Sequence, residues 1–192
     1  MSLIDKPVDA PKILVIAGPN GSGKSTITAG LPITGSYVNA DDIKAMTDCS
    51  DLQAAQKAEA TRELLLAKRR DLTFETVLST SRNLAFLQRA KDAGYRIEAV
   101  FVLTRSSEVN IARVRSRAAQ GGHGVPEEKI VSRYERSLAN LPQLIALADR
   151  VRIVDNTGEA PELLCETQNG TATIMISRHW TQNDILRLIS GS

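Results

Sequence analysis

The sequence of 192 residues has the length of one ordinary domain and carries 24 basic against 22 acidic residues, a net charge of +2. This balance excludes the strong basic excess that nucleic-acid coat proteins and membrane-surface proteins need. The longest apolar runs, at 13–17 and 99–103, are far below the roughly 18 residues that span a bilayer, and residues 1–11 lack the apolar segment of a signal peptide. Two widely spaced cysteines, Cys49 and Cys165, exclude a disulfide framework or zinc site, so we expect a cytoplasmic protein.

Hydrophobic runs alternate with longer amphipathic stretches, a pattern that is typical of βαβ units and a largely parallel sheet. The pattern predicts strands at 12–17, 36–39, 72–76, 95–103 and 150–154. It predicts helices at 24–31, from 41 onward, and at 51–70, 83–93, 105–120 and 126–141. The helix at 51–70 would end in three cations, residues 68–70, which suit a helix C-terminus.

The C-terminal part follows a different pattern. Two strands, 162–168 and 171–177, flank Asn169-Gly170, a strong two-residue hairpin signal. Thr181 and Asp184 resemble a helix-capping pair before a short helix at 185–189. We therefore predict a single domain over residues 1–192, with a core at about 12–156 and an antiparallel hairpin-and-helix extension at about 160–192.

A glycine-rich segment follows the first predicted strand and precedes a predicted helix. Residues 18–25 read Gly-Pro-Asn-Gly-Ser-Gly-Lys-Ser and match G-x-x-x-x-G-K-[ST] at every fixed position. Glycines let successive amides point inward as an anion nest, Lys24 supplies a charge for the β- and γ-phosphates, and the Ser25 hydroxyl suits Mg²⁺. A glycine-rich turn that binds nothing is the alternative, but the context favours nucleotide binding by Gly18, Pro19, Asn20, Gly21, Ser22, Gly23, Lys24, Ser25 and Thr26.

Other motifs narrow the class of nucleotide-binding protein. The sequence has no N-K-x-D motif of a GTPase and no L-S-G-G-Q-like signature of an ABC transporter ATPase. Residues 155–158 match D-x-x-G, but they follow the last predicted core strand, where a phosphate-sensing switch would be misplaced. Carboxylates and arginines near the expected phosphate end instead indicate a small kinase, which needs a base for an acceptor hydroxyl and cations for the migrating phosphoryl group.

Two acidic segments follow predicted strands and should meet at the carboxyl edge of the sheet. Asp41, in Asn39-Ala40-Asp41-Asp42, is our candidate base for the acceptor hydroxyl; capping of the helix that begins there is an equal alternative. Glu75, in Phe74-Glu75-Thr76, would lie on the same edge, with an ordinary surface glutamate as the alternative.

These segments, together with His123-Gly124-Val125-Pro126 and Arg133-Tyr134-Glu135-Arg136-Ser137-Leu138, resemble the zeta-toxin family of P-loop kinases. The resemblance runs from about residue 12 to 156 and implies a P-loop NTPase fold, similar to that of nucleoside-monophosphate kinases. It also implies phosphorylation of a sugar hydroxyl of UDP-N-acetylglucosamine and restraint by a small helical antitoxin. The sequence differs from the family's toxins at Asn39, where the first Asp of Asp-x-Asp is common, and at Val77, where a glycine is expected.

The resemblance assigns roles to particular residues. It implies Asp41 as the base, Lys24 and Ser25 as the phosphate and metal residues, and Glu75 as a substrate-side carboxylate. We add Thr76, Arg82 and Arg136 as further candidate substrate-binding residues.

An arginine-rich stretch lies between the last two core strands. Arg113 and Arg117 would share one helix face and Arg133 and Arg136 another, with a glycine-rich lid at 120–124 between them. A guanidinium offers forked donors to phosphate oxygens, so we expect Arg117 and Arg133 to stabilise transferred charge; a solvated helix face is the alternative. His123 is expected at a loop tip, and Asn156 and Thr157 could offer backbone contacts to adenine.

The sequence thus predicts an α/β kinase that uses ATP and Mg²⁺ and phosphorylates a hydroxyl of a nucleotide sugar. A kinase of a nucleoside, sugar or antibiotic, and a non-catalytic ATP-dependent regulatory module, remain alternatives. Single-stranded nucleic acid is a poor acceptor candidate, because aromatic residues for base stacking make up 4% of the chain.

Overall fold

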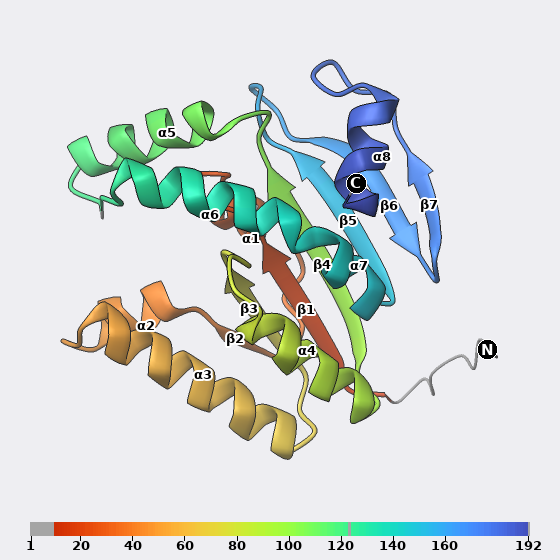
Figure 1. Ribbon diagram of the computed structural model, residues 1–192. Coiled ribbons are helices and arrows are strands. Elements are labelled where there is room, and N and C mark those ends of the chain that lie inside the picture. Colours follow the sequence, from red (N-terminus) through yellow and green to blue (C-terminus); the bar gives the residue numbers. More distant parts are fainter. Residues whose placement is uncertain (1–9, 123, 192) are drawn as a thin grey trace.

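A seven-stranded sheet forms the centre of the molecule in the computed structural model, which describes residues 10–122 and 124–191 (Figure 1). Its strand order is β2-β3-β1-β4-β5-β6-β7. The parallel part consists of β1 (Lys12–Ala17), β2 (Ser36–Val38), β3 (Leu72–Thr76), β4 (Arg96–Leu103) and β5 (Arg150–Asp155). β6 (Glu162–Gln168) and β7 (Thr171–Ile174) add antiparallel to the β5 edge.

Eight helices connect or flank these strands in the described part of the chain. They are α1 (Lys24–Ala29), α2 (Ala40–Met46), α3 (Asp51–Ala67), α4 (Arg82–Asp92), α5 (Ser107–Ala119), α6 (Glu127–Ala139), α7 (Leu141–Leu147) and α8 (Gln182–Ser190). Within this part no helix is long and apolar enough to cross a membrane.

The two faces of the sheet are covered unequally. Ile13, Val15 and the alternate residues of the neighbouring strands belong to the main core, which α4, α7 and α8 complete; α4 and α7 lie in front of the sheet in Figure 1. Leu14 and Ile16 point to the opposite face, into a smaller cluster with Ile27 of α1. The central parallel strands are therefore buried on both sides, which explains their nearly continuous hydrophobic runs.

The predicted α/β architecture is confirmed, and most element positions agree within a few residues. The extension is also as predicted: β6 and β7 flank Asn169-Gly170, and Thr181 and Asp184 cap α8 with reciprocal hydrogen bonds. Because β6 pairs with β5 and Ile185 joins the main core, this extension is continuous with the sheet.

Several boundaries differ for physical reasons. The helix predicted at 51–70 ends at Ala67, because Arg69 adopts a left-handed conformation with φ +51°, so the three cations at 68–70 all follow the helix. β2 ends at Val38, because Asn39 turns to cap α2. The helix predicted at 126–141 stops at Ala139, and Asn140 separates it from α7, which the sequence analysis missed.

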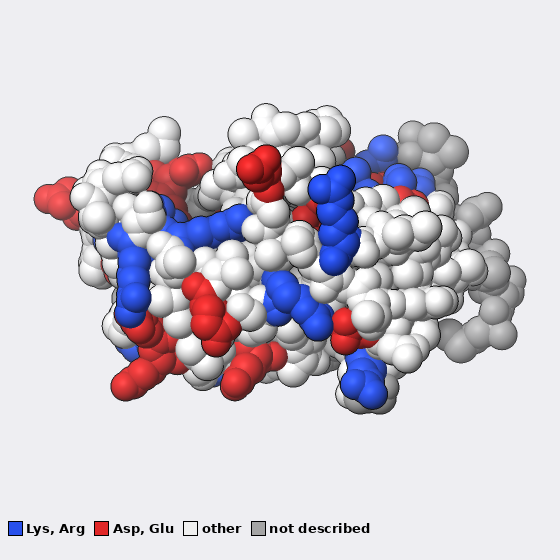
Figure 2. All heavy atoms as spheres, turned by 90° about the horizontal axis from the view of Figure 1, so that it is seen from above, with Lys and Arg blue, Asp and Glu red and all other residues white. Residues whose placement is uncertain are grey.

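All five parallel strands end at the edge seen from above in Figure 2. Basic and acidic side chains are interspersed over this face, without a field of one sign. The view agrees with the nearly balanced charge of the sequence and places no extended basic surface there.

Candidate active site

The loop between β1 and α1 has the backbone that a phosphate cradle requires. Gly18 has φ +142° and Gly23 has φ +91°, conformations that L side chains rarely adopt. A Cβ at position 18 would lie 2.0 Å from the Val102 carbonyl oxygen, and one at position 23 would lie 2.1 Å from Nδ2 of Asn156. Only glycine fits at either position, so the loop can keep its amides turned inward.

Lys24 begins α1 and folds back over this loop. Its Nζ donates hydrogen bonds to the carbonyl oxygens of Gly18 (2.9 Å) and Pro19 (3.2 Å). Burial lowers the pKa of Lys24 to about 8, while the nearby carboxylates of Glu75 and Asp41 act in the opposite direction. The lysine therefore lies within electrostatic reach of both candidate carboxylates.

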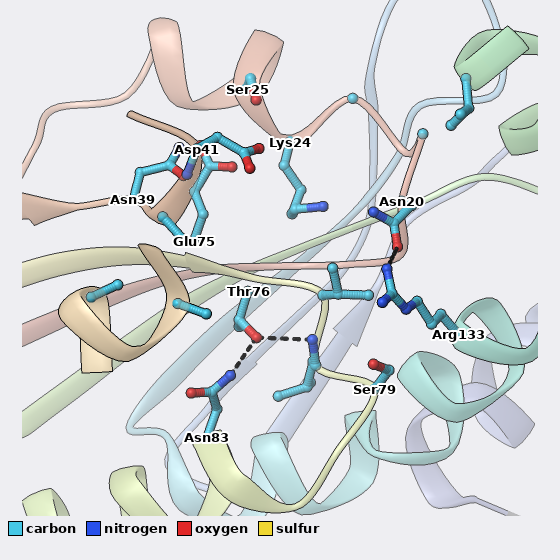
Figure 3. A pocket seen from close by; sticks show the side chains of 18 of the residues that line it. Asn20, Lys24, Ser25, Asn39, Asp41, Glu75, Thr76, Ser79, Asn83 and Arg133 are labelled. Carbon is cyan, nitrogen blue, oxygen red and sulfur yellow. Dashed lines mark hydrogen bonds between the residues drawn. The ribbon is translucent and has the colours of Figure 1, made fainter. Parts of the chain in front are cut away.

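Asp41 lies in the first turn of α2, and the capping role proposed as its alternative belongs to Asn39. The Asn39 side-chain oxygen accepts a hydrogen bond from the Asp41 amide at 2.9 Å, in the manner of a helix N-cap. Figure 3 shows the Asp41 carboxylate turned toward Ser25 and Lys24. Asn39 thus frees the carboxylate of Asp41 to face the cavity.

Glu75 is the last residue but one of β3, and it lies in register with Ile16 of β1, the strand that leads into the phosphate-binding loop. Its Oε1 accepts hydrogen bonds from the hydroxyls of Thr28 and Tyr37, both at 2.7 Å. Burial and the bond to Glu75 raise the pKa of the Tyr37 phenol, which stays a donor. The position of this carboxylate is therefore fixed by two donors, unlike that of an ordinary surface glutamate.

Thr76 organises the loop that follows β3. Its hydroxyl oxygen accepts hydrogen bonds from the Leu78 amide (2.9 Å) and from Nδ2 of Asn83 (2.7 Å), as Figure 3 shows. Leu78 has φ +56°, so the chain turns sharply there. The turn brings residues 79–83 to the wall of the cavity.

These groups line one cavity of about 1100 Å³ at the carboxyl edge of the sheet. The wall draws on the phosphate-binding loop, the start of α2, one face of α3, the loop after β3, the arginines of α5 and α6, and the loop after β5. The candidate residues on the wall are Asn20, Gly21, Gly23, Lys24, Ser25, Thr26, Asp41, Glu75, Thr76, Arg82, Arg117 and Arg133.

Not every candidate touches the cavity. Gly18, Pro19 and Ser22 belong to the loop but are buried away from the cavity wall. Arg136 is exposed, its Nε donates to the Ser132 carbonyl oxygen (3.0 Å), and it is absent from the wall formed by residues 10–122 and 124–191. The prediction that Arg136 binds the substrate therefore gains no support from its position. His123 lies outside the described residues.

Three candidate arginines occupy different parts of the wall. Arg133 donates from Nη1 to Oδ1 of Asn20 in the loop (3.2 Å), as Figure 3 shows. Arg117 is close enough to Lys24 to lower its pKa slightly. Arg82 lines the cavity from α4 and forms an ion pair with Glu59 (3.3 Å).

Three wall residues were missed or underrated by the sequence analysis. Asn156 donates from Nδ2 to the Ser22 carbonyl oxygen (2.8 Å), so its side chain supports the phosphate-binding loop, whereas the sequence analysis considered only backbone contacts to adenine. Arg113 donates to the Thr157 carbonyl oxygen at 3.4 Å. Arg62 of α3 is buried at the wall, and the sequence analysis did not single it out.

The oxygen atoms of the site suit a magnesium ion. The Ser25 hydroxyl is exposed beside the cavity, and the carboxylates of Asp41 and Glu75 lie within electrostatic reach of Lys24. Mg²⁺ is a hard cation that is bound by few protein oxygens together with phosphates and water. The described residues contain no cluster of three or more His, Cys, Asp or Glu side chains that could hold a metal ion.

A family model described as zeta toxin matches residues 3–162. The chain belongs to the zeta toxin family. The resemblance seen in the sequence is thereby confirmed, and it covers most of the chain. Among curated proteins, this zeta toxin family member is 25% identical over 129 residues to an uncharacterized protein of Haemophilus influenzae, covering 64% of this chain and 92% of that protein.

Solved structures share the fold. A chain from the complex titled AvrRxo1-ORF1:AvrRxo1-ORF2 with sulphate ions aligns with a TM-score of 0.67 at 17% identity, covering 85% of this chain. A chain from the PezAT chromosomal toxin-antitoxin system of Streptococcus pneumoniae aligns with a TM-score of 0.61 at 16% identity, covering 98% of this chain and 88% of that one. The present chain spans 60% of the length of the AvrRxo1 chain that it matches.

Proposed function

We propose that this zeta toxin family member is a kinase that transfers the γ-phosphate of ATP to a hydroxyl group of a small molecule. The observation that carries the proposal is the position of Asp41, whose carboxylate faces the cavity opposite Lys24 and takes no part in capping α2. A base beside a triphosphate cradle is what phosphoryl transfer to a hydroxyl requires.

The chain's own residues would divide the reaction as follows. The backbone amides of the glycine-rich loop and Lys24 hold the β- and γ-phosphates. Asp41 accepts the proton of the acceptor hydroxyl as the new O–P bond forms and the bond between the γ-phosphorus and the oxygen leaving with ADP breaks. Arg117 and Arg133 offset the charge on the migrating group.

Magnesium would be held by the Ser25 hydroxyl and the nucleotide phosphates. When bound, the ion neutralises phosphate charge and keeps the β- and γ-phosphates aligned. One neighbour was solved in a complex whose title includes ATP, at a TM-score of 0.67 and 16% identity, which supports the choice of nucleotide.

The acceptor we propose is a nucleotide sugar similar to UDP-N-acetylglucosamine, the substrate that the family resemblance implies. A small helical antitoxin is the partner we propose, because the Streptococcus neighbour comes from a toxin-antitoxin system. The free cysteines, Cys49 and Cys165, fit a reducing cytoplasm, where we expect the protein to act.

Asp41→Asn tests the proposal. The substitution keeps the size of the side chain but removes the base, so we expect phosphoryl transfer to fall by about 10²–10⁴-fold while ATP affinity stays nearly constant. Transfer is measured by mass spectrometry of the acceptor and affinity by calorimetry.

The matched control is Asp42→Asn, one residue along α2, exposed and absent from the cavity wall. It should retain transfer. Full activity in Asp41→Asn would remove Asp41 from the mechanism.

A panel of acceptors separates the proposed function from its rivals. The protein is incubated with ATP and with nucleotide sugars, nucleosides, sugars, antibiotics and oligonucleotides, and the products are identified by mass spectrometry. A phosphorylated nucleoside or antibiotic would correct the acceptor and keep the kinase. Tight ATP binding without any product would favour a regulatory module instead.

A further inference from the structure

One face of α3 forms a wall of the cavity on the side of the loop after β3. Ala55, Ala58, Glu59 and Arg62 line the cavity there at helical spacing. The two alanines leave room, and the two longer side chains supply charge. Asn83, to which Arg62 donates, lies at the end of the cavity away from Ser25 in Figure 3.

Arg62 is buried to an extent that is rare for arginine. Its residue is 9% exposed, and the guanidinium carbon lies 4.9 Å from the ring centroid of Phe74 and 5.8 Å from that of Phe86. Nη2 donates to Oδ1 of Asn83 at 3.2 Å, whereas Nε is buried without a hydrogen-bond partner.

The neighbouring carboxylates are engaged elsewhere. Glu59 pairs with Arg82, and Glu63 pairs with Arg89. Across the part of the chain that the structure describes, no carboxylate lies within ion-pair distance of Arg62. Its charge is offset only by two aromatic faces and one amide oxygen, and more distantly by the two glutamates.

A buried charge without a counter-ion is costly, and a guanidinium stays protonated even where burial lowers its pKa. An apolar side chain would fill this place against Phe74 and Phe86 without that cost. A ligand with a negative charge would offset the cost of burying the Arg62 guanidinium, and this explains why a cation lies at the wall of the cavity.

We propose that Arg62 binds a phosphate group of the acceptor. The inference rests on the proposed function, because it assumes that the second substrate occupies the α3 side of this cavity. ATP is held by the loop between β1 and α1, at the other side. The planar guanidinium offers forked donors to phosphate oxygens, and its burial strengthens each such bond. Arg62 thereby selects acceptors that carry a phosphate over neutral sugars and nucleosides.

A purely structural role is the competing explanation, because Arg62 holds Asn83, and Asn83 holds Thr76. Three substitutions separate the two. Arg62→Lys keeps a cation, Arg62→Gln keeps an uncharged donor on a side chain two bonds shorter, and Arg62→Met has the length of glutamine without a donor. Binding to a phosphate group follows charge, whereas support of Asn83 follows the hydrogen bond.

The matched control is Arg89→Met. Arg89 lies over the same Phe86 ring, at 5.9 Å, but from α4 and outside the cavity wall. The same change of side chain is thus made beside the same aromatic ring without touching the proposed subsite.

The experiment titrates pyrophosphate by calorimetry into protein saturated with Mg²⁺ and a non-hydrolysable ATP analogue. We expect wild type to bind pyrophosphate and Arg62→Met and Arg62→Gln to bind it roughly tenfold or more weakly, the effect of one charge-assisted hydrogen bond. Arg62→Lys should fall between wild type and these two, and Arg89→Met should equal wild type. Circular dichroism checks that each variant is folded; Arg62→Gln and Arg62→Lys decide the question if Arg62→Met does not fold.

The proposal is overturned if wild type binds no pyrophosphate, if Arg62→Gln binds it as well as wild type does, or if Arg62→Lys binds no better than Arg62→Gln. Before pyrophosphate is added, the ATP analogue is titrated alone into the protein, and this measurement tests the proposed function separately. If the analogue fails to bind, the kinase assignment fails, while the comparison of the Arg62 variants still decides whether this arginine binds a phosphate.

Discussion

The amine of Lys24 is removed from solvent, and yet its proposed role in binding phosphates needs a positive charge. With a pKa of about 8 in the free protein, it is protonated below that pH and increasingly neutral above it. Below about pH 8 the burial of the charged Lys24 lowers the free energy of unfolding. Between about pH 8 and the ordinary pKa of 10.5, the unfolded chain binds more protons at this residue than the folded chain does, so this loss of stability is relieved as the pH rises.

The same titration predicts a pH dependence of nucleotide binding. Bound phosphates favour the charged lysine, so the dissociation constant of the ATP analogue should be flat below pH 8 and rise above it, by at most about tenfold per pH unit. Calorimetry between pH 7 and 9.5 measures it. Lys24→Arg stays charged and should give a flat profile; a flat profile in wild type would mean that Lys24 does not sense the phosphates.

Single residues mark the limit of what the sequence could predict in the site. The motif at 18–25 identifies Lys24 and Ser25 by spacing alone, and the structure places both at the cavity. The choice between base and cap for Asp41 could not be made from the sequence, because Asn39 and Asp41 are both good caps. Arg62 was missed, because its burial depends on Phe74 and Phe86, which lie on other elements.

Helix ends show what local sequence determines. Thr181 and Asp184 form a complete capping box on α8, with hydrogen bonds of 3.0 and 3.2 Å, and this was readable from spacing. The boundary between α6 and α7 also has a local signal, because Pro142 lies in the first turn of α7, and the sequence analysis did not use it. A tertiary contact supports the same boundary, since Asn140 donates to the Leu78 carbonyl oxygen on a distant loop (2.8 Å).

Thr181→Ala should destabilise the protein by about 1 kcal/mol, because an amide at the start of α8 loses its acceptor. Urea unfolding measures the change in the free energy of unfolding. Thr181→Ser retains the hydroxyl and should cost much less, and neither variant should alter phosphoryl transfer, since Thr181 is absent from the cavity wall. Equal stability of the alanine variant and wild type would show that α8 is held by packing alone.

At the scale of the whole molecule, the alternation of strands and helices predicted the parallel sheet, but not its order. Strand order depends on contacts between segments far apart in the sequence, and β1 lies between β3 and β4, at the centre of the five parallel strands. The C-terminal extension was predicted as an addition to one domain, and its residues Leu164, Trp180 and Ile185 lie in the main core.

A chain that ends at Glu159 should therefore lose cooperative folding, because the removed segment leaves the core beside α7 exposed. Thermal unfolding followed by circular dichroism measures this. Ile176→Ser changes a fully exposed residue of the same segment (102%) and should unfold like wild type. An unchanged unfolding midpoint in the shortened chain would mean that the first 159 residues form an independent unit.

Trp180 is the single tryptophan of the sequence. It is 8% exposed, lies 4.5 Å from the guanidinium of Arg105, and belongs to the main core. The tryptophan fluorescence of this protein consequently comes from one indole, and a red shift of its emission would report the release of the C-terminal segment without any added label.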